Sequence, residues 1–512
     1  MNRLSTTNRK ARHARPGKGP AATLTATLTA ALTAALIVLT LGACTTGPAY
    51  QRPGISTTGA YKEASFDGKL WKNAEPRDHL PRGPWWEMFG DPILNDLAAQ
   101  VPASNQNLKL AYAKYAQAQA LIQSARAGYF PAVNLSGGET RGQNATAGGV
   151  RTSGPASTDS VSISASNWEL DLWGRIRGGV DANTASAEAA LADVEASRLS
   201  LIAQLAQSYF SLRMLDEQVK LLKQTAADYQ RALELTQHRY AAGVVAKSDV
   251  TQALTQLKST QAQAIDAGIA RAQYEHAIAV LTGRVPAEFN LPVASAVGQV
   301  PNIPLAAPSD LLERRPDIAA AERRTAAANA QIGAAKAALF PALTLSAGAG
   351  YRNSEWANLF TLPNRFWSIG PALALTLFDG GLKRSQISQA EAVYDQNAAT
   401  YRQTVLTAFQ EVEDSLAAIR ILGEQAVVQG DALKAAEASL FHVLNQYQAG
   451  VTNYLAVITA QTAALSNSRA VLDVQARRFT ASLNLIKALG GGFDVKHAPT
   501  PQPSDAVAAP RR

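Results

Sequence analysis

The chain contains little of what most enzymes and disulfide-stabilised proteins use. Its 512 residues include one cysteine, six histidines and three methionines. A single cysteine excludes an intramolecular disulfide, and the histidines lack the spacing of metal ligands. The sequence also has no phosphate-binding loop, dinucleotide fingerprint or nucleophile elbow. We therefore predict a protein that is not an enzyme, with no metal and no cofactor apart from a covalent lipid on Cys44.

The first 43 residues have the features of a secretory signal peptide. Six basic residues precede an apolar run from Ala21 to Leu41, and Leu41-Gly42-Ala43-Cys44 follows. The run approaches the roughly 20 residues that span a bilayer, so a retained membrane anchor is the alternative. Small residues next to the only cysteine favour cleavage instead and resemble the lipobox of bacterial lipoproteins. We expect Cys44 to carry the lipid, and the long basic segment leaves open a later translation start.

The basic charge of the chain belongs mostly to this removed segment. The formal net charge is +8, and residues 1–43 hold six basic and no acidic residues. The mature chain therefore has a net charge of about +2. Nucleic-acid binding requires a basic surface, so the sequence predicts no nucleic-acid partner.

The second half of the chain repeats the first. Arg126-Ala127-Gly128-Tyr129-Phe130-Pro131 returns as Lys336-Ala337-Ala338-Leu339-Phe340-Pro341, and Tyr240-Ala241-Ala242-Gly243-Val244 returns as Tyr447-Gln448-Ala449-Gly450-Val451. Such repeats decide the architecture before any single residue does. The predicted parts are a signal peptide (1–43), a lipidated tether and start of an equatorial region (44–104), a first repeat (105–283), a proline-rich connector (284–315), a second repeat (316–490) and a disordered tail (491–512).

Each repeat contains two predicted strands with alternating side chains. The segments are 131–140, 159–172, 341–351 and 365–378. Their lengths match a tilted strand that crosses a bilayer, and the alternation of apolar with small polar residues is typical of a membrane barrel with a wet lumen. The alternation in the second strand changes phase, which predicts a β-bulge near Asn167. Two hairpins on a soluble core are the alternative, but much longer helices flank both copies.

Helical periodicity dominates the rest of each repeat. A helix is predicted from about 105 to 128, and nearly unbroken periodicity follows each strand pair to Tyr240 and Tyr447. The chain turns at Gly243 and Gly450 and returns as helices to about Thr282 and Leu489. About 65 helical residues extend roughly 100 Å, too long for the core of a compact domain.

Four strands cannot stand alone in lipid, because an open sheet leaves backbone groups without hydrogen-bond partners. A dimer would give a barrel of eight strands, and side chains would fill its interior. Three copies give twelve strands and a pore. We therefore predict a homotrimer, and four copies are not excluded. A trimeric coiled-coil spacer without a lumen is a rival, but it would show strict heptads and no repeated strand pairs.

Several motifs identify a resemblance to a known family. They are Leu311-Leu312-Glu313-Arg314-Arg315-Pro316-Asp317-Ile318, Ala321-Glu322-Arg323-Arg324, the segment 328–336, Trp86-Glu87-Met88-Phe89-Gly90-Asp91-Pro92 and Asp171-Leu172-Trp173-Gly174-Arg175. Over about residues 44–490 the chain resembles the TolC-like outer-membrane factors, within them the NodT/OprM-type lipoproteins of tripartite efflux systems. Thr45, after Cys44, agrees with outer-membrane sorting in that family.

This resemblance implies a mixed α and β membrane protein with internal duplication. Its trimer would combine a twelve-stranded β-barrel, four strands per chain, with a continuous periplasmic α-helical barrel. The implied partners are a periplasmic adaptor (membrane fusion) protein, a proton-driven inner-membrane pump of the resistance-nodulation-division class and outer-membrane lipid. The implied location is the outer membrane, anchored by lipid and barrel and extending into the periplasm.

The resemblance also assigns roles to residues near the two helical turns. Adaptor docking is expected at Gly243, Val244, Gly450, Val451 and Thr452, although the glycines also suit a positive φ in a tight turn. A periplasmic gate is expected at Leu455, whose apolar ring would exclude water. Thr459 stands where relatives often have Asp, which argues against a carboxylate ring. Asp249 is the remaining acidic gate candidate, and a first-turn or N-cap carboxylate is its alternative role.

Together these observations predict a passive, gated duct that exports drugs or other toxic small molecules from adaptor and pump to the exterior. The alternative is the outer-membrane duct of a protein or peptide secretion system. Lipidation and the Arg314-Arg315-Pro316-Asp317 region favour small-molecule efflux.

Overall fold

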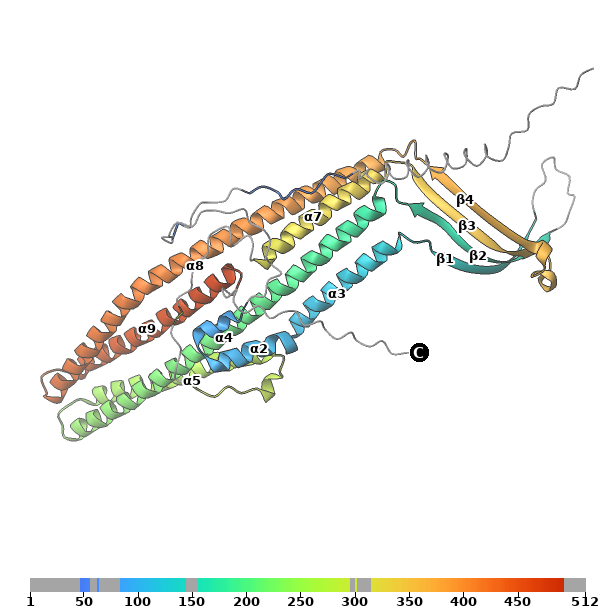
Figure 1. The fold of residues 1–512 in the computed structure, drawn as a ribbon. Coiled ribbons are helices and arrows are strands. Elements are labelled where there is room, and N and C mark those ends of the chain that lie inside the picture. The colour runs from blue at the N-terminus through green and yellow to red at the C-terminus, as the bar shows by residue number, and fades with distance from the viewer. Residues whose placement is uncertain are drawn as a thin grey trace, which may run out of the picture. The chain divides into compact units, whose positions relative to one another are not determined.

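The computed structural model describes residues 47–55, 62–63, 83–143, 155–294, 300–301 and 315–491 (Figure 1). The predicted signal peptide, Cys44, the motif residues 311–314 and the tail beyond residue 491 lie outside these residues. The described chain divides into two compact units. Of the described residues, one unit contains 47–48, 127–143, 155–179 and 333–387, and the other contains most of the helical residues. Each sequence repeat contributes to both units.

The first unit is built around one antiparallel sheet. Its strands are β1 (Val133–Gly142), β2 (Ala156–Leu170), β3 (Ala342–Asn353) and β4 (Arg365–Ala374), paired in the order β1-β2-β3-β4 (Figure 1). The β2–β3 register shifts between Ala165 and Trp168, and Asn167 has a φ of 54°. The predicted bulge is therefore confirmed. It keeps Trp168 and Leu170 on the same face as Ile163 despite the change of phase.

The fourth strand is shorter than its alternation predicts. The pattern extends to Phe378, but the ladder ends where Ala342 pairs with Ala374. β3 begins directly after Pro341, so residues beyond Ala374 have no strand to pair with. The alternation of one strand cannot reveal where its neighbour starts.

The pairing register gives the sheet two chemically different faces. One face is mostly apolar, with charged residues near the loop end, and the other carries mainly small polar residues and glycine. This is the pattern of a membrane strand with a wet lumen. The apolar face includes Val133, Leu135, Val161, Ile163, Ala165, Leu343, Leu345, Ala347, Ala349, Trp367, Ile369 and Leu373. The polar face includes Asn134, Ser136, Gly138, Thr140, Ser160, Ser162, Ser164, Thr344, Ser346, Gly348, Gly350, Ser368 and Gly370.

The helices of the two repeats have equal lengths. α3 (Gln106–Ala127) and α7 (Pro316–Ala337) have 22 residues each, and α4 (Arg175–Ala241) and α8 (Leu382–Gln448) have 67 each. The returning helices α5 (Lys247–Leu281) and α9 (Tyr454–Ala488) have 35 each. These lengths confirm the predicted duplication. None of the helices in the described ranges is both long and apolar enough to cross a membrane.

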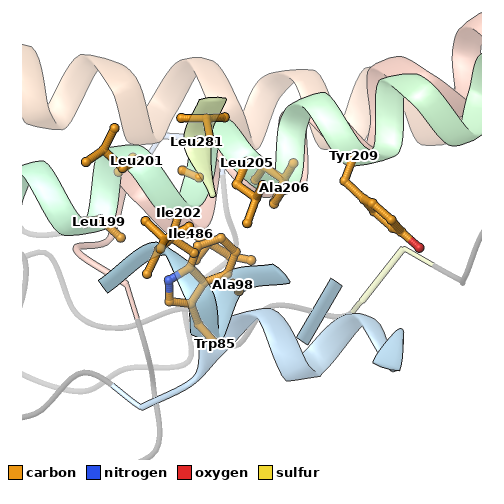
Figure 2. Close-up of a cluster of buried hydrophobic side chains, with 14 of the residues drawn as sticks. Trp85, Ala98, Leu199, Leu201, Ile202, Leu205, Ala206, Tyr209, Leu281 and Ile486 are labelled. Carbon is orange, nitrogen blue, oxygen red and sulfur yellow. The ribbon is translucent and has the colours of Figure 1, made fainter. Parts of the chain in front are cut away.

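A hydrophobic core fills the middle of the helical unit (Figure 2). Residues of α4 at helical spacing supply Ile202, Leu205 and Tyr209, each almost fully buried. Short segments before α3 cover it, namely the 3-10 helix η1 (Trp85–Phe89) and α2 (Pro92–Ser104). The sequence suggests that α2 ends near Asp96, but the helix continues to Ser104 because Leu97, Ala98 and Val101 pack into this core.

Two of the family-like motifs act as structural ties in the helical unit. The Asp91 carboxylate caps α2 by accepting hydrogen bonds from the backbone N–H groups of Ile93 and Leu94. It also accepts a hydrogen bond from the Tyr209 hydroxyl at 2.6 Å. Arg315 donates to Asp317, to Glu411 (2.6 Å) and to the carbonyl of Ala488 (3.1 Å). Burial opposes the charge of this guanidinium, but the bonds to Asp317 and Glu411 raise the pKa of Arg315 above its ordinary value. Both motifs therefore have structural roles in this chain.

Short 3-10 helices complete the described elements. η2 (Pro286–Glu288) lies in the connector after α5. η3 (Trp356–Asn358) and η4 (Leu362–Asn364) lie in the loop between β3 and β4. This loop has an internal hydrogen-bond network, in which Asn364 donates to the Asn358 carbonyl at 2.7 Å and to the Thr361 hydroxyl at 2.9 Å.

Candidate functional site: the tip of the helical hairpins

The two helical hairpins turn with the same backbone geometry. Gly243 and Gly450 have φ values of 74° and 79°, in the left-handed region. Val244 N–H donates to the Arg239 carbonyl, and Val451 N–H donates to the Gln446 carbonyl, both at 2.9 Å. This is the Schellman motif that ends a helix with glycine at its C′ position. The turn geometry alone therefore requires both glycines.

A small hydrophobic cluster, the tip cluster, joins the two hairpins below these turns. Its buried members come from all four helices α4, α5, α8 and α9: Tyr229, Leu233, Ala253, Leu257, Tyr447, Tyr454 and Val457. The rings of Tyr447 and Tyr454 lie 5.4 Å apart. Burial, with Tyr447, Tyr229 and the Asp249 carboxylate, raises the pKa of Tyr454 to about 12. The phenol therefore stays neutral within the cluster at any physiological pH.

Arg239 adds a polar tie from the first hairpin to the second. Its guanidinium carbon lies over the Tyr447 ring, 4.5 Å from the ring centroid, and the guanidinium donates a hydrogen bond to the Tyr447 carbonyl. The Thr236 and Tyr447 hydroxyls lie 3.4 Å apart. Sequence reasoning missed Arg239, although one signal was available. The repeat places Arg239 and Gln446 at equivalent positions, so the cation occurs on one hairpin only.

The predicted gate residues Leu455 and Thr459 lie one turn apart on α9. The Thr459 hydroxyl donates to the Leu455 carbonyl at 2.9 Å. Both side chains are exposed, Leu455 by 60%. Tyr454, just before Leu455, and Val457, between the two, are buried in the tip cluster. Leu455 therefore lies on a face of α9 that no other part of the described chain covers.

Asp249 lies in the first turn of α5, three residues after the N-cap position Ala246. It is partly buried, and its carboxylate accepts from the Ser248 hydroxyl at 3.3 Å. The N-cap of α9 is different, because the Asn453 side chain accepts from Ala456 N–H at 3.2 Å. Asp249 thus occupies the position where a carboxylate stabilises the positive end of a helix, the alternative role considered from the sequence.

The predicted docking residues surround the turns. Val244 is 61% exposed and Val451 is 77% exposed, and Thr452 is half-buried. Below them, a groove of about 1160 Å³ lies between the hairpins, lined by apolar residues such as Ile265 and Leu433 and by charged residues such as Lys220 and Glu437. The turns therefore present exposed apolar side chains, whereas the groove lies farther along the helices, where its lining includes Asp216 and the connector residue Val293.

Comparison with known proteins identifies the family. The family described as outer membrane efflux protein matches residues 97–284 and 307–491. The chain belongs to this family. As an outer membrane efflux protein, it is a passive conduit rather than an enzyme, and it resides in the outer membrane and extends into the periplasm.

Two relatives cover nearly the whole efflux protein. The outer membrane protein OprJ of Pseudomonas aeruginosa is 33% identical over 470 residues, 90% of this chain and 95% of OprJ. The toluene efflux pump outer membrane protein TtgC of Pseudomonas putida is 31% identical over 460 residues, 88% of this chain and 93% of TtgC.

Solved structures agree with this assignment. The outer-membrane channel OprN has a TM-score of 0.78 and 31% identity, with 88% of this chain and 99% of OprN covered. The open-state MtrE outer membrane channel of Neisseria gonorrhoeae has a TM-score of 0.74 and 26% identity, with coverage of 88% and 98%. The predicted fold class, a mixed α and β protein forming a trimeric barrel with four strands per chain, is confirmed. So is the predicted efflux function.

Proposed function

We propose that this efflux protein is a gated exit duct whose tip docks a periplasmic adaptor. A proton-driven inner-membrane pump supplies the energy, because the family is a passive conduit. Small molecules are its cargo, in keeping with a relative named for toluene efflux. No observation favours the alternative, a duct for proteins or peptides. Cys44 carries a covalent lipid, which mass spectrometry of the mature N-terminus would detect.

The observation that supports docking at the tip is the contrast between its buried and exposed apolar residues. Tyr229, Tyr447 and Tyr454 are buried in the tip cluster, whereas Val244 and Val451 are mostly exposed at the turns. Exposed apolar side chains grouped at one end of an elongated element are typical of a protein–protein contact. Gly243 and Gly450 hold these valines in place through the turn geometry, and Thr452 follows Val451 on the proposed docking surface.

The gate proposal rests on the outward face of α9. Three copies of Leu455, related by the symmetry of the trimer, would form an apolar ring that excludes water, and Thr459 would add a neutral polar ring one turn away. A threonine ring carries no charge, so this gate would not bind cations as a carboxylate ring does. Asp249 would act at the gate only through its helix and the tip cluster.

Substitution of an exposed turn residue tests the docking proposal. Val451→Glu should reduce ethidium efflux, in a host lacking its own copy of the gene, to the level of the empty vector. The amount of trimer in the outer membrane should stay normal, because the Val451 side chain is mostly exposed. Gln448→Glu places the same charge at a neighbouring exposed position and should retain efflux. Normal efflux by the Val451 variant would contradict docking at this turn.

A further inference from the structure

Arg352 lies on the polar face of the sheet at the end where loops join the strands. It pairs in register with Ser160 of β2, two residues beyond Gly350, on the face that carries serine, threonine and glycine. The strands connect to helices at the opposite end. Since the protein extends into the periplasm through its helices, the loop end faces the exterior.

Arg352 is isolated from other charges on this face. Among the described strand residues on the polar face, the other charged side chain is Glu169, at the opposite end and paired with Arg175 at 2.6 Å. The strand acids nearest to the loop end, Glu139 and Asp159, pair with each other in register on the apolar face. The positive charge of Arg352 therefore has no strand carboxylate beside it on its own side of the sheet. Within the described residues, Glu355 in the loop after β3 accepts from Asn358 and forms no ion pair with Arg352.

The structure also holds the Arg352 side chain in place. Its guanidinium carbon lies 5.0 Å from the centroid of Phe366, a residue of β4 on the same face. A cation over an aromatic ring is attracted by the ring's quadrupole without losing its charge. Arg352 remains exposed, and within the described residues it forms no ion pair. A fixed, exposed and unneutralised cation thus points away from the apolar face.

We propose that Arg352 forms a ring of three guanidinium groups at the outer mouth of the channel and makes this mouth selective for anions. In the trimeric barrel the apolar face contacts lipid, so the polar face lines the lumen. The threefold symmetry then supplies three cations at one height. Rings of arginine or lysine are how pores favour anions.

The ring has two consequences for small molecules. Anionic compounds leaving the channel are attracted to its mouth, and cationic compounds outside are repelled from re-entering. Below the ring, the described polar-face residues of the strands carry no charge apart from Glu169, which is paired with Arg175. Selectivity by charge is therefore confined to Arg352 within the described part of the barrel wall.

Reversal potentials in planar bilayers under a potassium chloride gradient test this proposal. Arg352→Gln should lower the permeability of chloride relative to potassium about twofold at low salt. The difference should vanish near 1 M salt, where the Debye length falls to about 3 Å. Trimers of wild type and variant are compared, each with and without Leu455→Ala so that a closed tip does not limit the current.

Arg365→Gln is the matched control. Arg365 pairs with Tyr351 on the opposite face, at almost the same height in the sheet, and is also exposed. Its loss should leave the reversal potential unchanged. Equal reversal potentials for wild type and the Arg352 variant would overturn the exit ring. Absence of current from every trimer would instead contradict the duct itself, so the two failures are distinguishable.

Discussion

The two repeats share one backbone plan but use equivalent positions differently. Arg213 in α4 and Arg420 in α8 are 207 residues apart, the same separation as the two turn glycines. The Arg213 side chain is 1% exposed and that of Arg420 is 51% exposed. Equal helix lengths therefore do not mean equal chemistry along the helices.

The buried arginine belongs to a charge network that holds the connector between the repeats. Asp216, itself 1% exposed, accepts from Arg213 at 3.2 Å and from Arg271 at 2.7 Å. The connector attaches through the carbonyl of Pro292, which accepts from Arg213, and through Leu291 N–H, which donates to Glu275. In the second repeat Gly423 replaces Asp216, and Arg420 pairs with Glu63 at the surface. The two repeats thus share the same helices, but within the described chain only the first repeat has the buried charges that bind the connector.

The largest expected effect follows from removing the buried carboxylate. Asp216→Ala leaves Arg213 buried without its anion, although Arg271 keeps Glu275 as a partner, and should destabilise the protein by about 3–5 kcal/mol. Unfolding of purified trimers in denaturant would measure the change. Gly423→Ala, at the equivalent position of α8, should not destabilise the trimer. Equal stability of the Asp216 variant and wild type would show that the network does not hold the connector.

The two turns should respond equally to loss of glycine. Gly243→Val and Gly450→Val each place a β-branched residue at a positive φ, at a cost of about 1–3 kcal/mol. The melting temperature should decrease by a similar amount in both variants, because the hydrogen bonds of the two turns match. Asparagine tolerates this conformation better and serves as the control. A decrease at only one turn would mean that the two glycines are not equivalent in the folded trimer.

The tie from Arg239 should have a smaller, local effect. Arg239→Ala removes the cation over Tyr447 and a hydrogen bond to its carbonyl, together worth about 1–2 kcal/mol. Hydrogen exchange of residues 447–455 should become faster, while exchange in the main core stays the same. Gln446→Ala, the exposed equivalent on the second hairpin, should leave exchange unchanged. Equal hydrogen-exchange rates in the Arg239 and Gln446 variants would contradict a stabilising tie from the first hairpin to the second.

The smallest effect is expected from Arg420→Ala. Its partners Glu63 and Glu424 are at the surface, where water and salt screen the attraction. The hydrogen bond from Arg420 lowers the pKa of Glu63, so any contribution of the pair would be lost as pH falls through that lowered pKa. Thermal unfolding at neutral pH should not differ from wild type. A large decrease would show that the surface pair matters as much as the buried one.

Element type and order could be predicted from the sequence because helical and strand periods differ along long segments. The bulge at Asn167 was also predictable, since a bulge must change the phase of the alternation. The end of β4 and the length of α2 were not, because each depends on a partner distant in sequence. Ala342 sets the first through pairing, and burial of Leu97 and Val101 sets the second.

The candidate site was predictable only in part. Repeated glycines located both turns, and α9 presents Leu455 and Thr459 on one exposed face. Arg239 and the Arg213–Asp216 network were missed, because isolated charges on a long helix give no periodic signal. Placing Arg352 on the polar face requires the pairing register of β2, β3 and β4. The sequence of the loop between β3 and β4 does not give that register.

Single-channel conductance of wild type and Leu455→Ala trimers in planar bilayers tests the central claim most directly. A gated duct with an apolar ring at Leu455 predicts low or flickering conductance in wild type and higher conductance in the variant, because alanine widens the ring and admits water. No conductance from either protein, with intact trimers, would contradict the gated duct.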